Sequence, residues 1–300
     1  MSLIKQLYRA LIPESIRKQR LVRKRKMHED AIKNNILSYY KQHPSNDEEI
    51  NTALSYLQSN DLSVFPYPFY LSYMKKIIEV KRETTNQLPY VMHMGHKLFF
   101  KKSWTDEHII DAYRFLLAEQ DANSPHCYLN DQYTIENNSI VIDVGAAEGI
   151  FALHLMDKIK HIYLIETDLE WIEALIETYK QWSNKITIIN KFVSNIDDAT
   201  NCKLDTYFAN TEKIDFLKID VDGAEQELIY GAENLIASKV KKLAICTYHK
   251  PDDNRDFSKY LLSKNYKIEN SKGYMLFFYF DNFVPPYFRR GLIKSEKLAS

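Results

Sequence analysis

From about residue 135 onward, short apolar segments with strand character alternate with amphipathic segments with helix character, and this alternation constrains the fold of the 300-residue chain most strongly. Repeated strand–helix units produce a parallel sheet with helices on both faces. The expected strands are 139–145, 161–167, 185–190, 215–220, 242–248, 266–270 and 273–280. Only a short Ser-Lys-Gly connection separates the last two, so this pair is expected to be antiparallel. The sequence therefore predicts an α/β fold with a mostly parallel sheet.

The preceding part of the chain has a different texture, with mostly helical periodicity over residues 28–120. Expected helices cover 29–42, 47–60, 69–83 and 105–120, with Thr105 as the N-cap of the last. Two apolar runs around Met94-Gly95 indicate a β-hairpin. We therefore expect a helical region with a hairpin at 28–125, the sheet domain at 126–284 and a tail without an assigned role at 285–300.

The N-terminal segment 1–27 is basic and amphipathic. Residues 1–26 hold nine Lys or Arg against the single acid Glu14, although the whole chain has a net charge of +0. Leu3, Ile4, Leu7, Tyr8, Leu11 and Ile12 share one helical face before Pro13. An apolar face beside a Lys/Arg cluster suits an anionic membrane surface. A docking helix with a solvated basic tail explains the same pattern, whereas a nucleic-acid-binding arm does not need the apolar face.

Bulk properties favour a cytoplasmic protein that could sit peripherally on a membrane. Cys127, Cys202 and Cys246 lie far apart without metal-ligand spacing, and so sparse a set favours reduced thiols. No apolar run reaches the roughly 20 residues of a membrane-spanning helix. The first residues also lack the pattern of a secretory signal peptide.

The first expected strand leads into a turn of small residues in "VIDVGAAEGIF". Asp143 closes the strand, and the turn contains Gly145, Ala146 and Gly149. Small residues let the backbone approach a ligand and direct helix N–H groups toward it. A dinucleotide fingerprint would place glycines where Ala147 and Ile150 stand. The turn therefore suits a nucleoside with an amino-acid tail, and a tight turn without a ligand is the alternative.

The second expected strand ends at Glu166, where an acid can accept hydrogen bonds from both ribose hydroxyls. The fourth strand, in "KIDFLKIDVDGAE", ends at Asp220, and the fifth brings His249 to the same edge of the sheet. Either group could act as a base toward a sugar hydroxyl, which is a poor nucleophile when neutral. A histidine in such a position is also commonly structural. Asp220 counts as both a catalytic and a cofactor-binding candidate.

A divalent metal at this edge is a weaker hypothesis. Asp220, Asp222, His249, Asp252 and Asp253 offer ligand atoms that suit Mg²⁺. However, "DGAE" is expected to turn into a helix, where Asp222 and Glu225 would favour the helix N-terminus. No metal ligand is therefore assigned. Glu119, His126 and Tyr133 precede the first strand and are candidate acceptor or cofactor contacts, with structural capping as the alternative.

Several of these motifs together resemble the FkbM-type S-adenosylmethionine-dependent methyltransferases. The resemblance runs from about Tyr128 to Phe280 and rests on "VIDVGAAEGIF", "IET", "LDTYF", "FLKIDVDGAEQELIYGAENLI" and "LAICTYHKPDD". It implies the Rossmann-like class I methyltransferase fold, with seven strands of which the last is antiparallel, and O-methylation, often of sugar or polyketide hydroxyls. The family usually has proline where Thr167 stands and commonly glutamate in place of Asp222.

The resemblance also implies roles for particular residues. Asp143, Gly145, Ala146 and Gly149 would line the methionine end of S-adenosylmethionine, Glu166 would bind its ribose, and Phe192 and Val193 would border its adenine. The expected function is O-methylation of a saccharide or glycan precursor, either a small molecule or lipid-linked, with residues 1–26 on an anionic membrane surface. A non-catalytic binding or scaffold protein is the first alternative. An RNA methyltransferase is the second, although no Asn-Pro-Pro-Tyr-type motif is present and nucleic acid is not an expected partner.

Overall fold

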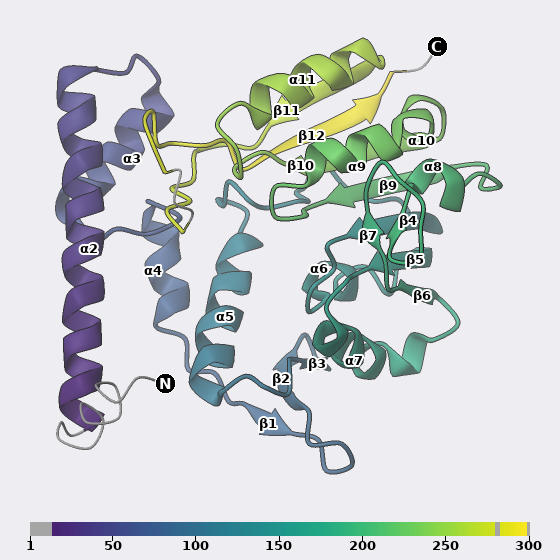
Figure 1. The fold of residues 1–300 in the computed structure, drawn as a ribbon, viewed down its shortest axis with the longest axis horizontal. Helices are drawn as coiled ribbons and strands as arrows, with labels where there is room; N and C mark the ends of the chain where they lie inside the picture. Colours follow the sequence, from purple (N-terminus) through teal and green to yellow (C-terminus); the bar gives the residue numbers. More distant parts are fainter. Residues whose placement is uncertain (1–13, 280–282, 299–300) are drawn as a thin grey trace. The chain divides into compact units, whose positions relative to one another are not determined.

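The structure is a computed structural model that describes residues 14–279 and 283–298. The chain forms two compact units (Figure 1). One contains Met1–Tyr67 and Leu276–Phe288, and the other contains Pro68–Met275 and Arg289–Ser300. The helical region expected at 28–125 is thus divided between the two units.

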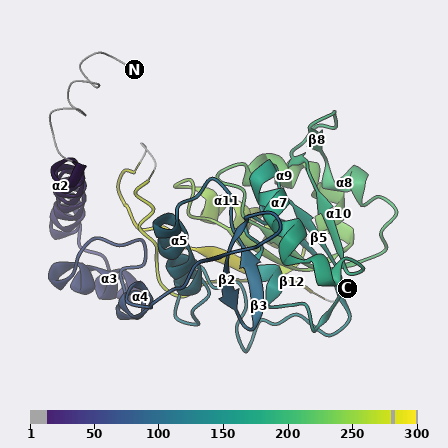
Figure 2. The ribbon, with the colours of Figure 1, turned by 90° about the horizontal axis from the view of Figure 1, so that it is seen from below.

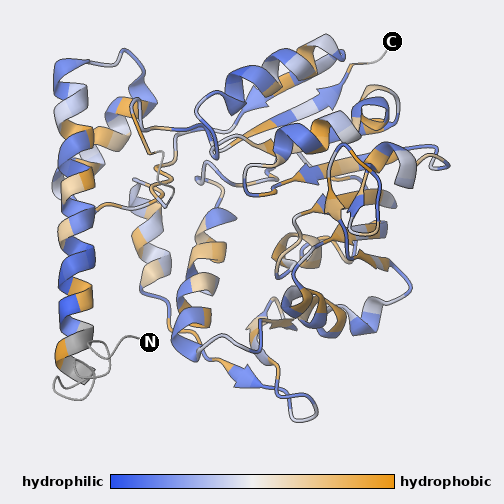
Figure 3. Ribbon diagram, viewed as in Figure 1, coloured by the Kyte–Doolittle hydropathy of each residue, from blue (hydrophilic) through white to orange (hydrophobic). Residues whose placement is uncertain are grey.

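The first unit is built on two helices, α2 (Glu14–Gln42) and α3 (Glu48–Ser59). Helix α2 is longer than the helix expected at 29–42, because it begins directly after Pro13 and includes most of the basic segment. Asp47 caps α3, since its side chain accepts hydrogen bonds from the backbone N–H groups of Glu49 and Ile50. Figure 3 shows that α2 is largely hydrophilic along its length. The amphipathic helix expected over residues 3–12 lies outside the described residues.

A distant chain segment completes this unit. The backbone N–H of Leu276 donates to the carbonyl oxygen of Val64 at 2.9 Å, and the Tyr40 hydroxyl donates to the carbonyl oxygen of Pro286. Ile36, Leu57 and Phe65 are fully buried and form the apolar interior. Within residues 14–279 and 283–298, no helix combines the length and hydropathy needed to cross a membrane.

The second unit contains the seven-stranded sheet in the order β11-β12-β10-β9-β4-β5-β6. The strands are β4 (Ser139–Val144), β5 (Ile159–Ile165), β6 (Ile186–Ile189), β9 (Ile214–Ile219), β10 (Val240–Cys246), β11 (Tyr266–Asn270) and β12 (Leu292–Lys297). Strand β12 pairs antiparallel with β10 and β11, and the other paired neighbours are parallel. This topology confirms the Rossmann-like class I methyltransferase fold.

The antiparallel strand is not the segment that the sequence indicated. Strand β12 comes from residues 285–300, which were expected to be a tail. Within its described residues 273–279, the strand expected at 273–280 contributes only the isolated bridge between Met275 and Arg289. The apolar side chains after Met275 belong to the first unit, where Leu276 is fully buried. Their hydropathy therefore reflects burial in a loop and not strand pairing.

Most remaining elements agree with the sequence. The hairpin consists of β2 (Pro89–His93) and β3 (His96–Phe99), with Met94 and Gly95 at φ values of 50° and 83°. Such positive values are typical of a tight hairpin turn. Thr105 caps α5 (Asp106–Glu119) as expected. Figure 2 shows the hairpin beside α7 (Leu169–Thr178), where the Phe99 N–H donates to the Thr178 hydroxyl.

Two expected helices are shorter or divided. The helix expected at 69–83 is only α4 (Pro68–Met74), and Lys81–Arg82 forms β1 against β2. The helix expected to begin at "DGAE" divides into α9 (Glu225–Gly231) and α10 (Glu233–Ser238). A Cβ atom at Gly231 would lie 1.9 Å from the Ser194 carbonyl oxygen, so this glycine permits a close backbone contact.

The other elements are short or cover the sheet. They are α6 (Ile150–Leu153), the 3₁₀ turn Lys180–Trp182, β7 (Phe192–Val193) paired with β8 (Asn201–Cys202), α8 (Leu204–Tyr207) and α11 (Asp253–Ser263). Buried side chains of the central strands, including Ile142, Leu217 and Leu243, form the core against these helices. The carboxyl ends of β4, β5, β9 and β10 meet at one edge, which is the site of ligand binding in open α/β sheets.

Candidate functional site

The tips of β4 and β9 approach each other at Gly145. Its φ is +75°, and a Cβ atom there would lie 1.8 Å from the carbonyl oxygen of Asp220. Only glycine fits this position, because any side chain would collide with backbone atoms. The N–H groups of Gly145 and Ala146 donate to the Ile165 carbonyl oxygen at 3.0 and 3.2 Å. The turn is therefore held between β5 and β9.

Glu166 lies at the tip of β5 with its carboxylate fixed by three backbone N–H groups. Oε2 accepts from Ala147 at 3.0 Å, and Oε1 accepts from Thr167 at 2.6 Å and Asp168 at 2.9 Å. A proline in place of Thr167 would have no N–H to donate. The departure from the family pattern at Thr167 thus adds a hydrogen bond that orients the carboxylate.

Five of the expected cofactor residues line one cavity of about 170 Å³. They are Gly145, Glu166, Phe192, Val193 and Asp220, joined by Lys191 and Asp222 among others. The cavity lies over the tips of β4, β5 and β9. The structure thus brings together the residues expected at the ribose and the adenine.

Asp143 and Gly149 do not line this cavity. Asp143 is fully buried and pairs with the Lys218 ammonium, whose Nζ lies 2.8 Å from Oδ1 and 2.9 Å from the Gly145 carbonyl oxygen. Burial alone would lower the pKa of Lys218, but the Asp143 and Asp220 carboxylates outweigh it and raise that pKa. Gly149 packs against Leu175 and Tyr179. Both expected residues therefore support the turn.

A second cavity of about 150 Å³ shares Gly145 and Asp220 with the first. Its lining includes Ala146 and two of the residues named upstream of the first strand, Glu119 and His126. Burial raises the pKa of Glu119 to about 7 and that of Glu148, which also lines this cavity, to about 8.

Tyr133, the third residue named upstream of the first strand, does not line this cavity. Its hydroxyl hydrogen-bonds the carbonyl oxygens of Leu243 and Ser295, each at 2.9 Å. This is the structural role given as its alternative.

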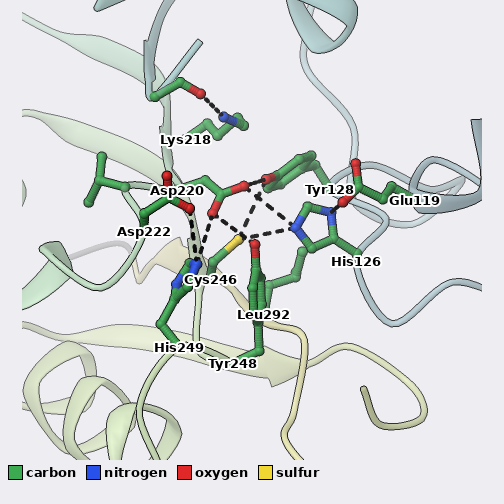
Figure 4. A network of polar contacts seen from close by, with 12 residues as sticks. Glu119, His126, Tyr128, Lys218, Asp220, Asp222, Cys246, Tyr248, His249 and Leu292 are labelled. Atoms are coloured by element: carbon green, nitrogen blue, oxygen red, sulfur yellow. Dashed lines mark hydrogen bonds and ion pairs between the residues drawn. The ribbon is translucent and has the colours of Figure 1, made fainter. Parts of the chain in front are cut away.

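Asp220 is the centre of a polar network between the two cavities (Figure 4). Tyr128 donates to its Oδ2 at 2.7 Å and Tyr248 donates to its Oδ1 at 3.2 Å. His126 Nε2 lies 3.5 Å from Oδ2. Burial would raise the pKa of Asp220, but His126 and Lys218 hold it well below the usual range. The carboxylate is therefore ionised at neutral pH.

His249 reaches the same network, although its surroundings oppose the expected role as a base. Its side chain is 1% exposed, with Nδ1 2.9 Å from Glu225 Oε1 and Nε2 4.0 Å from Asp220 Oδ1. Burial alone would lower the pKa of His249, but Asp222 and Glu225 outweigh it and raise the pKa to about 10. A ring that already carries a proton at neutral pH cannot accept another.

The metal-ligand set considered from the sequence is gathered only in part. Ligand atoms of Asp220 and His249 lie within 4.8 Å of each other and of Glu225, and Asp222 Oδ1 lies 3.7 Å from His249 Nε2, whereas Asp252 and Asp253 have other partners. Asp253 accepts a hydrogen bond from the Lys250 N–H at 2.8 Å, and Asp252 pairs with Arg255 at 2.9 Å. Glu225 begins α9 and accepts from the N–H groups of Val221 and Gly223, which agrees with the expected helix start.

Sequence reasoning missed Tyr128, Tyr248, Glu148 and Cys246 as members of the site. Tyr248 carried a usable signal, because it stands beside His249 at the tip of the fifth strand. Tyr128 and Cys246 carried none, since their neighbours come from distant parts of the chain.

Residues 177–268 match the sequence model of the methyltransferase FkbM domain, and this confirms the resemblance. A search of curated protein sequences finds no match to the chain. The matched segment contains Asp220, Cys246 and His249.

Several solved structures are similar to the chain. Methyltransferase FkbM from Methylobacillus flagellatus is 20% identical with a TM-score of 0.45, and the alignment covers 63% of this chain but only 51% of that one. TrmK from M. capricolum, in complex with S-adenosylhomocysteine, is 17% identical with a TM-score of 0.37, covering 57% and 69%. Precorrin-6y C5,15-methyltransferase from Geobacter metallireducens is 11% identical with a TM-score of 0.38, covering 66% and 94%.

Proposed function

We propose that the protein is an S-adenosylmethionine-dependent O-methyltransferase acting on a hydroxyl of a saccharide or glycan precursor, and the premise is the match of residues 177–268 to the FkbM methyltransferase domain. The observation that carries the proposal is the convergence of Gly145, Glu166, Phe192, Val193 and Asp220 on one cavity. A second cavity adjoins Gly145 and Asp220 on the side of Glu119.

The residues fit the chemistry of this cofactor. Gly145 lets the turn after β4 lie directly against the tip of β9, so that both border the cavity. Among the described residues, Glu166 Oε2 accepts one backbone hydrogen bond, so lone pairs remain for ribose hydroxyls. Phe192 is 43% exposed and offers an apolar surface to a flat base. Two cavities on either side of Gly145 suit a ligand with a nucleoside at one end and an amino acid at the other.

The cofactor supplies an electrophilic methyl group, so the chain mainly has to position an acceptor. The ionised Asp220 carboxylate borders both cavities and can accept a hydrogen bond from an acceptor hydroxyl. Tyr128 and Tyr248 fix its orientation by donating to different oxygens. His249 in its protonated form adds positive charge beside Asp220 and keeps it ionised.

The resemblance to the FkbM family supports the proposed class of acceptor, and the basic N-terminal segment supports the proposed binding to a membrane surface. On α2, the apolar residues Leu21, Val22 and Met27 are 68%, 68% and 64% exposed among basic residues. Apolar side chains within a basic segment can enter the headgroup region of an anionic bilayer. Flotation with anionic liposomes should therefore fall when residues 1–26 are removed, and equal flotation would remove the membrane part of the proposal.

Calorimetric titration with S-adenosylhomocysteine tests the enzymatic proposal. The wild-type protein should bind, and Glu166→Ala should weaken binding at least about tenfold through loss of the ribose contact. Absence of binding by the folded wild-type protein would leave the scaffold alternative. Mass analysis of a glycan panel incubated with S-adenosylmethionine would then identify the acceptor.

A further inference from the structure

We propose that His126, Asp220 and Cys246 form a binding site for a divalent ion of the zinc class. The ligand atoms would be His126 Nε2, Asp220 Oδ2 and Cys246 Sγ. If the proposed function holds, this ion would hold the acceptor hydroxyl beside the methyl donor, and that role rests on the proposed function. Binding of the ion itself does not depend on it.

The ligand types and their spacing carry this inference. His126 Nε2 lies 3.5 Å from Asp220 Oδ2 and 3.6 Å from Cys246 Sγ, and the three ligand atoms lie within 4.8 Å of one another. A tetrahedral zinc ion with bonds of about 2.0–2.3 Å places its ligand atoms roughly 3.3–3.7 Å apart. The two separations from His126 Nε2 thus match the spacing of ligand atoms in one coordination shell.

Hydrogen bonding accounts for only one of these two distances, because 3.6 Å is within hydrogen-bond range for the contact of His126 Nε2 with the Cys246 sulfur. An N–H···O hydrogen bond is typically about 2.7–3.2 Å long, which is shorter than the separation of His126 Nε2 from Asp220. One ring nitrogen also lies about equally far from a carboxylate and a sulfur atom, whereas a single proton can serve only one of them well. An ion between the three atoms would contact all of them.

The surroundings supply the groups that support a metal ligand. His126 is 2% exposed, and its Nδ1 has no hydrogen-bond partner among the described residues. Glu119 Oε1 lies 3.9 Å from that nitrogen. Metal-bound histidines usually direct their second ring N–H to a carboxylate, and a small side-chain shift would complete this contact. Tyr128 already orients Asp220 through its 2.7 Å hydrogen bond.

The burial of the ligands indicates an open coordination position. Cys246 is fully buried at the end of β10, whereas His126 and Asp220 also line the cavity of about 150 Å³. Three protein ligands beside a cavity are typical of a zinc site that binds a further molecule. The available position would therefore face the cavity and accept an oxygen atom of the acceptor.

Titration of the metal-stripped full-length protein with Co²⁺ tests the proposal. Cobalt bound to a thiolate gives an intense near-ultraviolet charge-transfer absorption, which the wild-type protein should show and Zn²⁺ should abolish by competition. Cys246→Ser should remove the absorption, and His126→Gln should weaken Co²⁺ binding at least about tenfold. Cys202→Ser is the matched control, because Cys202 is also buried but lies on β8.

The outcomes separate this proposal from the proposed function. No absorption in the wild-type protein, or absorption that survives Cys246→Ser, would overturn the metal site. If Cys246→Ser does not fold, His126→Gln decides, and unchanged Co²⁺ affinity there overturns the site equally. Titration of the metal-free protein with S-adenosylhomocysteine tests the proposed function separately, because Gly145, Glu166, Phe192 and Val193 line the cofactor cavity and are not ligands of the ion.

Discussion

At Gly145 the tips of β4 and β9 come closer than a side chain would allow. The clash would be with the Asp220 carbonyl oxygen, and Asp220 also borders both cavities. A Cβ atom added at Gly145 would therefore displace both the backbone of β9 and the Asp220 side chain that borders the cavities. The small-residue pattern was readable from the sequence, but its partner Asp220 was not, because that contact depends on how the strands pair.

Gly145→Ala should abolish binding of S-adenosylhomocysteine and lower the free energy of unfolding by about 2 kcal/mol or more, because a Cβ atom would overlap backbone. Gly95→Ala is the control, since φ there is +83° but nothing lies within 4 Å of the added atom. This control should cost about 1 kcal/mol through φ strain and leave binding intact. Calorimetry and urea unfolding measure both effects. Equal losses in both variants would contradict the argument.

A buried histidine pair away from the site predicts a pH-dependent stability. His93 Nε2 lies 2.6 Å from His154 Nε2, and Tyr113 OH lies 2.8 Å from His93 Nδ1. Burial and then the neighbouring His154 lower the pKa of His93 from 6.5 to about 4. The folded state thus keeps the ring neutral, whereas the unfolded chain takes up a proton below 6.5. Stability is complete above that value and is lost as the pH falls toward about 4.

Urea unfolding at about pH 7 and about pH 5 should show a loss of roughly 1–2 kcal/mol from this group. His93→Gln should flatten that part of the pH profile, because the titrating ring is gone. His43→Gln changes an exposed histidine and should leave the profile unchanged. A profile that is identical in wild type and His93→Gln would argue against the pair.

At the scale of elements, the alternation of strands and helices was sufficient to predict the parallel strands. Each of them is a compact apolar run such as "SIVIDV", bounded by turn residues. Strand β12 was not predicted because four of the six residues in "LIKSEK" are polar, and its burial comes from its position between β10 and β11. Cys246 was assigned to the correct strand, but a single sequence does not show that His126 lies beside it.

Ile293→Ala tests the assignment of β12. Ile293 is fully buried, so its truncation should lower the free energy of unfolding by about 2–4 kcal/mol, as expected for a core position. Leu298→Ala is a nearby control at 48% exposure and should cost less than about 0.5 kcal/mol. Chemical denaturation of both variants compares them directly. A small effect at Ile293 would show that β12 is not part of the sheet.

At the scale of the whole molecule, the sheet and both cavities belong to one unit, although that unit is interrupted in sequence. Residues 276–288 leave it after Met275 and return at Arg289. Two backbone hydrogen bonds of 2.7 and 2.9 Å join Met275 to Arg289, so the two ends of the excursion lie side by side. The division was hidden in the sequence because the apolar run through this region continues without a break.

Because Met275 and Arg289 are paired, a short Gly-Ser linker can replace residues 276–288. A chain of residues 68–275, this linker and residues 289–300 should fold, and its affinity for S-adenosylhomocysteine should lie within about threefold of that of the full chain. Circular dichroism and calorimetry measure the two properties. A matched deletion that ends the same chain at Met275 removes β12 and should not fold. If the linked chain also failed to fold, the first unit would be needed for the stability of the sheet.

The interrupted path also affects how the protein responds to proteases. The chain passes between the units three times, at 67–68, 275–276 and 288–289. A nick at the first passage cuts the only direct link from α2 and α3 to the rest of the chain. Their fragment nevertheless remains bonded to residues 276–288, through Val64 with Leu276 and Tyr40 with Pro286. The two fragments should therefore elute together under native conditions and separate only in denaturant.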